Sequence, residues 1–431
     1  MKYHAIDREL FITNRTKFTA QMKPNSVAIF NSNDIYPVSA DSTLPFAQHR
    51  DIFYLSGADQ EESILLLFPD APYAHLREIL FLRETNEHIA IWEGEKLTKE
   101  RAFEVSGIRN IVWLQDFQKT LKEVMAYADT MYINTNEHYR AAVETQTRED
   151  RFIKWWKETY PAHKVEKSNP ILQRIRSVKE NQELALMQTA CDITEKGFRR
   201  ILSFVKPGVM EYEIEAEFAH EFLRNRSKGF AYTPIIASGA NANVLHYIEN
   251  NQECKAGDLL LLDVGAEYAN YSSDLSRTIP VSGRFTDRQR AVYNAVLNVK
   301  NEATKLLVPG TLWKEYHVEV GKIMTSELLG LGLLDKADVQ NEDAAWPAYK
   351  KYFMHGTSHH LGLDTHDYGL LYEPMQPNMV FTVEPGIYIP AEGFGIRLED
   401  DVVIQKSGAP FNLMRNIPIE AEEIEALMND N

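Results

Sequence analysis

The stretch GDLLLLDVGAEYANYSSDLSRT, residues 257–278, decides the fold of the chain. Its four consecutive leucines predict a strand buried in a core, but the run ends at a carboxylate, Asp263, and a second carboxylate follows at Asp274. An ionised carboxylate in an apolar interior costs several kcal/mol unless a positive group meets it. The sequence therefore predicts that something positive lies beside this strand.

Asp263 and Asp274 are expected to face each other across an antiparallel hairpin. Residues 257–264 and 271–280 have the character of two strands, and the sequence EYAN between them can turn. If the two carboxylates are paired, the turn is centred between Tyr268 and Ala269. Cross-strand partners have Cβ atoms about 4.5–5.5 Å apart, and like charges at that distance repel. The pair is unfavourable unless a cation lies between the carboxylates or they share a proton.

The sequence NMVFTVEPGIYIPAEGFGIRLEDDVVI, residues 378–404, repeats this pattern. Glu384 and Glu399 lie on two apolar strands, and the centre between them falls inside the turn-forming sequence PAEG. Acids that point to solvent, or ion pairs with Arg277 and Arg397, could explain one such pair. Two independent pairs favour a binding function.

A histidine cluster, HGTSHHLGLDTHD at residues 355–367, contains a large share of the 13 histidines in the chain. Its members are His355, His359, His360 and His366. The first two share a face in an extended segment as well as in a helix. Gly356 stands where the zincin pattern requires a glutamate, which disfavours that class of metalloprotease. His360 is expected to point away from His359 and receives no role.

Four carboxylates with one imidazole form an oxygen-rich set of ligands. Such a set favours Mn²⁺, with Zn²⁺ or Co²⁺ as alternatives. Four carboxylates are too many for a single zinc ion but suit two adjacent ions with bridging carboxylates.

The composition disfavours several classes of protein. A net charge of −16 and a pI of about 5.4 argue against a nucleic-acid or anionic membrane partner, because phosphate binding needs clustered Lys and Arg. The two cysteines, Cys191 and Cys254, are expected to be ordinary core residues. The N-terminal sequence MKYHAIDREL lacks the apolar region of a signal peptide, and no apolar run could span a membrane, so a cytoplasmic protein is expected.

The 431 residues are enough for two domains. Residues 1–165 alternate strands and helices and predict an α/β domain, and the proline-containing segment 158–176 is the expected boundary. Residues 171–431 predict a larger α+β domain. Its first long helix is expected to begin at a Ser177 cap, and further helices are expected at 210–226 and 286–307.

The sequence resembles the pita-bread metallopeptidases, most closely those of the aminopeptidase P group. The matching segments, in the order of the family, are VLHYIEN, LLLDVGAEY, YSSDLSRTIPVSG, HGTSHHLGLDTHD, VFTVEPGIYIP and GIRLEDDVVI. They lie in the part of the chain that runs from about Ile171 to the end. The resemblance implies a pita-bread catalytic domain at 171–431, preceded by an α/β domain that shapes the mouth of the site and supports homodimers or homotetramers.

The N-terminal domain matches the family more weakly, through HRDIFYLSGADQEESILLL and IWEGEKLT. Trp92 is in the family's tryptophan position, with plain core packing as the alternative. Many members carry an arginine in the sequence FRQ, but this chain has Phe46, Ala47 and Gln48 there. Any oligomer or substrate contact of that arginine is therefore in doubt.

The resemblance implies two divalent metal ions, commonly Mn²⁺, held by five side chains. These are Asp263, Asp274, His359, Glu384 and Glu399. Asp274 and Glu399 would bridge the two ions. Asp263 would complete one site, and His359 and Glu384 would complete the other.

The same resemblance implies the residues around the substrate. His246 and His366 would contact the substrate and stabilise the tetrahedral intermediate, and His355 would line the same pocket. Arg397 would be a supporting charge in substrate binding. Glu384 would take the proton of the attacking water and pass it to the leaving nitrogen.

The implied reaction is hydrolysis of the bond between an N-terminal residue and a following proline, by a hydroxide that bridges the metal ions. The substrates would be peptides with proline at the second position. The main alternative is prolidase, which shares the ligands but cleaves only dipeptides. A second alternative is a catalytically inactive pita-bread module used for protein binding, but such proteins lose ligands, and all five are present in this sequence.

Overall fold

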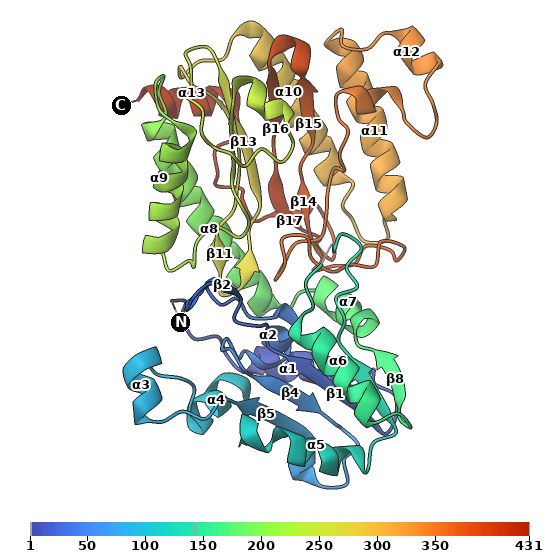
Figure 1. Ribbon diagram of the computed structural model, residues 1–431. Helices are drawn as coiled ribbons and strands as arrows, with labels where there is room; N and C mark the ends of the chain where they lie inside the picture. Colours follow the sequence, from blue (N-terminus) through green and yellow to red (C-terminus); the bar gives the residue numbers. More distant parts are fainter. Residues whose placement is uncertain (1, 142–143, 431) are drawn as a thin grey trace. The chain divides into compact units, whose positions relative to one another are not determined.

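The computed structural model describes residues 2–141 and 144–430 (Figure 1). The chain divides into two compact units, Tyr3–Arg176 and Ser177–Asn431. The sequence placed the end of the first domain at 165 and the start of the second at 171. None of the described helices is long and apolar enough to cross a membrane.

The N-terminal unit is built on a six-stranded mixed sheet with the order β6-β5-β4-β1-β7-β8. Its strands are β1 (Ser26–Asn31), β4 (Ile64–Leu67), β5 (Glu78–Leu82), β6 (Asn110–Trp113), β7 (Thr130–Ile133) and β8 (Lys164–Lys167). The β1–β4 and β4–β5 pairs are antiparallel, whereas β1–β7, β5–β6 and β7–β8 are parallel. The first five of these strands were predicted from the sequence, and the α/β architecture is confirmed.

Seven helices and a small hairpin complete the described part of this unit. The helices are α1 (Glu9–Thr19), α2 (Arg50–Ser56), α3 (Glu87–Glu93), α4 (Lys99–Ser106), α5 (Phe117–Met125), α6 (Arg148–Thr159) and α7 (Asn169–Ser177), and the hairpin joins β2 (Pro37–Ser39) to β3 (Ser42–Thr43). Alternate strand residues such as Ile29 and Leu66 pack with Leu121 of α5 and Trp156 of α6. Phe18 of α1 packs edge-on against Phe30, which alternates with Ile29 along β1, at 5.3 Å between ring centroids. Apolar neighbours on both faces explain why these strands have few polar positions.

The segment expected as the domain boundary, 158–176, ends where the two units divide, and it is largely regular structure, because it contains β8 and most of α7. Ser177 is the last residue of α7 and does not cap the following helix, so that prediction was wrong. The next helix, α8, begins at Asn181, and the backbone N–H of Glu180 donates to the Glu183 carboxylate at 2.8 Å. Residues 178–180 separate the two helices because Lys179 N–H bonds to the Asn378 carbonyl and holds this stretch extended.

The C-terminal unit has six helices within its described residues. They are α8 (Asn181–Phe204), α9 (Glu211–Arg224), α10 (Asp287–Lys305), α11 (Trp313–Gly330), α12 (Lys336–Gln340) and α13 (Ala421–Asn429). Figure 1 shows the strands of this unit between α8 and α9 on one side and α10 and α11 on the other. Helix α11 was not predicted, although its buried residues Tyr316, Val320, Met324 and Leu328 recur at helical spacing. The buried thiols of Cys191 and Cys254 are core residues, as expected.

Four short sheets form the centre of the C-terminal unit. Their strands are β9 (Ile235–Ser238), β10 (Leu259–Val264) and β13 (Leu275–Pro280); β11 (Glu267–Tyr268) and β12 (Tyr271–Ser272); β14 (Val380–Val383), β17 (Asp400–Val403) and β18 (Phe411–Asn412); and β15 (Gly386–Ile389) and β16 (Phe394–Arg397).

The first hairpin has a different register from the expected one. In the β10–β13 ladder Asp263 pairs with Ser276, so Asp274 lies two residues away from the position opposite Asp263. The reason is the turn: Ala269 and Asn270 both have positive φ and form a two-residue turn whose centre is one residue later than predicted, which moves the pairing by two residues. Because the shift is even, the two acids are still expected on the same face of the sheet. The prediction of directly opposed carboxylates was wrong, but that of a shared face fits this register.

The second hairpin has the predicted register. Gly386 pairs with Arg397, and Val383 pairs with Asp400, which leaves Glu384 and Glu399 at corresponding positions between the two ladders. The ladder is interrupted at Pro385, which has no N–H to donate. Glu384 and Glu399 therefore lie together at a gap in the hydrogen-bonded ladder.

Candidate metal centre and active site

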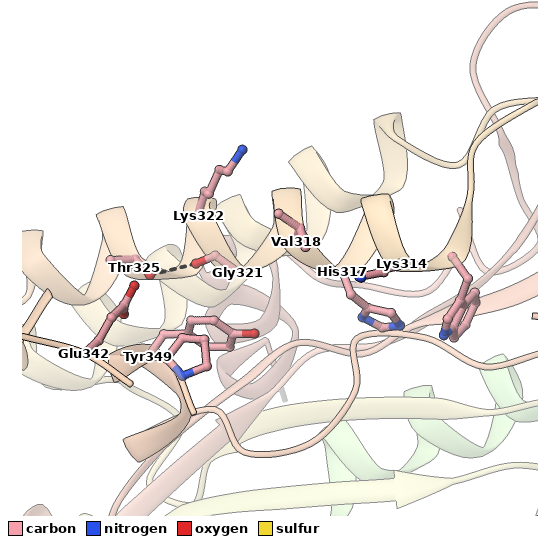
Figure 2. Close-up of a pocket in the computed structure, with 10 residues that line it drawn as sticks. Lys314, His317, Val318, Gly321, Lys322, Thr325, Glu342 and Tyr349 are labelled. Atoms are coloured by element: carbon pink, nitrogen blue, oxygen red, sulfur yellow. Dashed lines mark hydrogen bonds between the residues drawn. The ribbon is translucent and has the colours of Figure 1, made fainter. Parts of the chain in front are cut away.

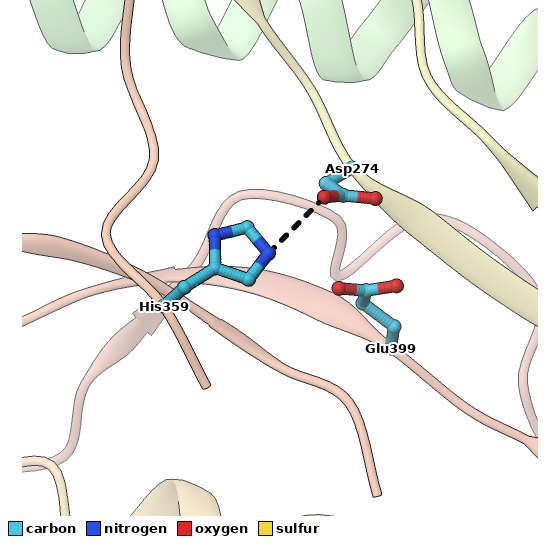
Figure 3. A group of neighbouring side chains, drawn as sticks. All are labelled: Asp274, His359 and Glu399. Carbon is cyan, nitrogen blue, oxygen red and sulfur yellow. Dashed lines mark ion pairs between the residues drawn. The ribbon is translucent and has the colours of Figure 1, made fainter. Parts of the chain in front are cut away.

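Three buried side chains form the centre of the site, Asp274, His359 and Glu399 (Figure 3). Each offers a ligand atom, and these atoms all lie within 4.8 Å of one another. His359 Nε2 is 3.4 Å from Asp274 Oδ2. The three residues come from the junction of β12 and β13, the loop before β14 and the junction of β16 and β17. Strand ends and a loop thus aim three potential ligands at one point.

Glu384 and Asp263 extend this cluster. Glu384 Oε1 lies 3.8 Å from His359 Nε2. The Tyr232 hydroxyl lies 2.7 Å from Asp263 Oδ1 and 2.6 Å from Asp274 Oδ1, and so joins these two acids. The structure therefore brings the five side chains that the resemblance named as ligands into one connected group.

Tyr232 also reveals a shortage of positive charge. A hydroxyl carries one proton and can donate it to one of the two carboxylates at a time. The second of the two short contacts between the Tyr232 oxygen and a carboxylate oxygen therefore needs a further proton or a cation. Arg397 supplies one positive charge, since its Nη2 lies 2.6 Å from Asp263 Oδ2. Arg277, the other arginine considered for the acids, is bonded to Asp400 instead, at 2.7 Å.

His359 is oriented as a metal ligand would be. Its Nδ1 lies 2.9 Å from the backbone carbonyl of His360, and its backbone N–H donates to the Thr382 hydroxyl at 3.1 Å. With the Nδ1 proton directed to that carbonyl, the lone pair of Nε2 points at the carboxylates. The His360 ring lies away from them, against Trp313 and Phe381, as the sequence predicted.

The electrostatics of the acids reflect their burial and mutual repulsion. Burial raises the pKa of Glu384 to about 7. Burial, followed by the charges of Asp274 and Glu384, holds the pKa of Glu399 well above its usual range. The pKa of Asp263 is also raised, chiefly by burial and against the opposing effect of Arg397. Burial disfavours the imidazolium of His359, but the carboxylates of Asp274 and Glu384 raise its pKa overall.

Glu399 supplies the test of whether a metal ion fits these residues. Its Oε2 accepts a hydrogen bond from the Ser276 hydroxyl at 2.6 Å, whereas its buried Oε1 has no hydrogen-bond partner in the described part of the chain. An orphaned buried acceptor costs about 1–3 kcal/mol or more when charged. A divalent cation beside Asp274, His359 and Glu399 would satisfy this oxygen, and carboxylate with imidazole is a suitable donor set.

Arg397 is part of the wall that holds these acids. It is 4% exposed, and besides Asp263 it donates from Nη1 to the Tyr388 hydroxyl at 2.8 Å and from Nε to the Ser276 hydroxyl at 2.9 Å. Because Ser276 in turn donates to Glu399, one guanidinium orients two of the acids. Its contact with substrate stays a prediction.

The three histidines that the resemblance named around the substrate lie near this group. His355 Nε2 lies 2.8 Å from the Tyr388 hydroxyl, and burial lowers its pKa to about 3, so its ring is neutral at pH 7. The ring of His366, an exposed residue, lies edge-on to His359, at 4.4 Å between centroids. His246 is exposed, and its charge contributes to the lowered pKa of His355 after burial and Arg397.

Sequence reasoning missed several residues that support the site. Tyr232 lies outside the matching segments and reaches Asp263 and Asp274 from another part of the chain, whereas Ser276 and Tyr388 lie within those segments but were given no role. Glu211 is a further case: its buried carboxylate accepts hydrogen bonds from several groups that flank His246. They are the backbone N–H and hydroxyl of Ser238, the amide of Asn241, the hydroxyl of Tyr247 and the backbone N–H of Gln252. One carboxylate thus fixes both ends of the segment that carries His246.

Comparison with known proteins identifies the family. Residues 185–406 match metallopeptidase family M24, and residues 11–132 match the aminopeptidase P N-terminal domain. The chain belongs to metallopeptidase family M24. It is 36% identical to the Xaa-Pro aminopeptidase of Escherichia coli (strain K12), over 98% of each chain.

Solved structures agree with this membership. A candidate aminopeptidase P from Bacillus anthracis superposes with a TM-score of 0.91 at 32% identity, over 99% of each chain. Zn-substituted Escherichia coli aminopeptidase P in complex with product gives a TM-score of 0.87 at 33% identity, also over 99% of each chain. The predicted pita-bread fold and the prediction of a metal-dependent peptidase are confirmed.

Proposed function

We propose that the chain is an aminopeptidase that hydrolyses the bond between an N-terminal residue and a following proline. The observation that carries this proposal is the group of four carboxylates and one imidazole, three of these five side chains buried, in a chain that aligns with an Xaa-Pro aminopeptidase over 98% of its length. The similarity to Xaa-Pro aminopeptidases favours this activity over that of a prolidase, which was the main alternative.

The proposed cofactor is a pair of divalent ions, with Mn²⁺ favoured and Zn²⁺ or Co²⁺ as alternatives. Asp274 and Glu399 would be shared between the ions, with Asp263 at one and His359 and Glu384 at the other. Such ions supply positive charge that lowers the pKa of a water and polarises a carbonyl group. The orphaned Glu399 oxygen and the raised pKa values of the acids support a cationic occupant.

Glu384 is the proposed proton carrier. Its carboxylate lies 3.8 Å from His359 Nε2, within the group that would hold the metal ions, so it is placed beside the water that those ions would activate. It would accept a proton from water and give it to the leaving nitrogen. The proline nitrogen in this bond has no N–H. Like any amide nitrogen, it must gain a proton to leave as an amine.

His246 and His366 are proposed to donate hydrogen bonds to the carbonyl oxygen of the bond that is cleaved, where negative charge develops. Both are exposed, in keeping with contact to a substrate that enters from solvent. His355 is neutral and half-buried, and it accepts a hydrogen bond from Tyr388. Its proposed role is to line the pocket and keep Tyr388 and Arg397 in place.

The roles of the N-terminal unit stay proposals. We infer that it shapes the mouth of the site and supports a homodimer or homotetramer, and that the protein acts in the cytoplasm. Trp92 is 77% exposed, so its core-packing alternative is wrong, and an exposed tryptophan is available for contact. Gln48 is buried and bonded to the carbonyls of Ala58 and Gln60, so this part of the FAQ sequence has a structural role.

The test is a panel of peptides of increasing length assayed with Mn²⁺, Zn²⁺ or Co²⁺. We expect Ala-Pro-Ala to release alanine, and longer peptides with proline at the second position to do the same. Ala-Ala-Ala is the matched control and should resist cleavage. Activity confined to the dipeptide Ala-Pro would identify a prolidase, and no activity with any metal would support the inactive module.

A further inference from the structure

A groove of about 540 Å³ lies between α11 and the segment 342–349, outside the group of acids described above (Figure 2). Its walls include Trp313, Lys314 and His317 of α11, and Glu342, Pro347 and Tyr349 of the facing segment. The volume is within the range of about 300–1,000 Å³ that is usual for small-molecule sites. The groove contains none of the proposed metal ligands or substrate histidines, so the proposed reaction does not explain it.

Gly321 lines the groove and lets the Tyr349 side chain approach the backbone of α11. A Cβ atom at this position would lie 2.7 Å from Cε1 of Tyr349, closer than real contacts allow. The helix therefore accepts the Tyr349 ring directly against its backbone, and Figure 2 shows this ring beneath Gly321 and Thr325. The nearest atoms of Tyr349 to that position are Cε1, Cζ and the hydroxyl oxygen, so one edge of the ring meets the helix at Gly321.

Several polar groups of the groove have no partner among the described residues. His317, Lys314 and the Tyr349 hydroxyl make no hydrogen bond or ion pair with protein there. Lys322 on the same helix, by contrast, is paired with Glu319 at 2.6 Å. Burial lowers the pKa of His317 to about 4, so its neutral ring has one donor and one acceptor to offer.

The charges of the groove are separated along its length. Lys314 lies at the His317 end, and the charge of Lys350 is near enough to lower the His317 pKa further, after burial. Glu342 lies at the other end, near Thr325, where it accepts the Ala348 N–H at 2.8 Å but pairs with no described cation. Figure 2 shows Lys322 directed away from Glu342. One end is therefore cationic and the other anionic.

The separation of these ends matches a short peptide. Lys314 and Thr325 are 11 positions apart on α11, and a helix rises 1.5 Å per residue, so the ends are roughly 16 Å apart. An extended chain covers at most about 3.3–3.6 Å per residue, which makes four to five residues the length that spans roughly this distance. Shorter peptides would also contact both ends, because the long side chains of Lys314 and Glu342 can extend toward them.

We propose that this groove is a second, non-catalytic site for short unblocked peptides. The peptide ammonium lies at Glu342, the carboxylate lies at Lys314 and His317, and the chain between them packs on Trp313 and Tyr349. This assignment rests on the charges and shape of the groove, and it does not depend on the proposed hydrolysis.

The helix that forms one wall also supports the loop that carries His359. Trp313 stacks on His360 with an angle of 10° between the rings, and the Tyr316 hydroxyl is 2.8 Å from the Ser358 hydroxyl. Changes in activity could therefore arise from this contact alone. The test measures binding directly for that reason.

The experiment is calorimetric titration of the purified protein with tetraglycine, which lacks proline and is not a proposed substrate. We expect saturable binding, weakened by about tenfold in Lys314→Glu and in Glu342→Lys, since each reversal replaces an attraction by a repulsion between like charges. Blocking both peptide termini, by N-acetylation and C-amidation, should weaken binding in the same way. The matched controls Lys406→Glu and Glu423→Lys reverse exposed charges outside the groove and should bind as the wild type does.

Asp274→Ala separates this site from the catalytic one. We expect this variant to bind tetraglycine with unchanged affinity. If the wild-type protein failed to cleave Ala-Pro-Ala, the proposed hydrolysis would be contradicted, but the expected binding of tetraglycine would stay the same. Binding that survives both charge reversals in the groove, or that Asp274→Ala abolishes, would place the peptide at the catalytic centre and overturn the proposal. An absence of binding to the wild type would overturn it as well.

Discussion

Replacing Asp274 with alanine is expected to abolish peptide hydrolysis. This carboxylate lies 3.4 Å from His359 Nε2 and shares the Tyr232 hydroxyl with Asp263, so it occupies the middle of the cluster. Loss of a residue that only supports a metal ligand already costs about 10–100-fold in affinity or activity. Loss of a proposed bridging ligand should lower the rate of alanine release from Ala-Pro-Ala by more than about 100-fold.

Glu423→Ala is the matched control for this variant, because it removes an exposed carboxylate of α13. It should retain full activity. The Asp274→Ala protein should remain folded, because removing one of several buried acids relieves repulsion in the metal-free state. Circular dichroism would check this. A folded Asp274→Ala protein with full activity would contradict the bridging assignment.

Removing divalent ions with a chelator is expected to abolish hydrolysis and to make stability depend on pH. The pKa of Glu384 is about 7 in the folded protein against a reference value of 4.5, and the pKa values of Asp263 and Glu399 are also raised. At pH values between about 4.5 and 7, these carboxyl groups keep protons in the folded chain that they have released in the unfolded chain. The free energy of unfolding of the metal-free protein should therefore fall as the pH rises from about 4.5 to 7.

Thermal unfolding at pH 5 and pH 8, with chelator or with Mn²⁺, measures this effect. Metal ions compete with protons for the same oxygens, so Mn²⁺ should raise the unfolding temperature more at pH 8 than at pH 5. Mg²⁺, which suits all-oxygen sites with several retained waters, is a control cation that should stabilise less. An Mn²⁺ effect that is equal at both pH values, or absent, would contradict a cationic occupant among these acids.

The two hairpins show how far spacing in a sequence can predict geometry. Around Glu384 and Glu399 the sequence PAEG sits at the centre of both ladders, and the register follows from it. Around Asp263 the turn is set by Ala269 and Asn270 in the left-handed region, where alanine is unusual, and this moves the pairing register by two residues. The spacing of acids predicts a shared face, but the backbone of the turn decides which residues are opposite.

Contacts between distant segments were beyond sequence reasoning. Tyr232 joins Asp263 to Asp274, and Glu211 anchors the segment of His246, yet neither residue belongs to a recognisable motif. A single tyrosine or glutamate has many possible partners, and only the packed fold selects one. The resemblance to the family identified candidate ligands, whereas the hydrogen bonds that orient them required the structure.

Counting the ions that bind is the most direct test of the central claim, that these acids hold two metal ions. Calorimetric titration of the metal-free protein with Mn²⁺ gives the number of ions bound by each chain. The account predicts two for the wild type. A stoichiometry of one would contradict the proposed sharing of Asp274 and Glu399 between two ions, and no binding would contradict the metal centre itself.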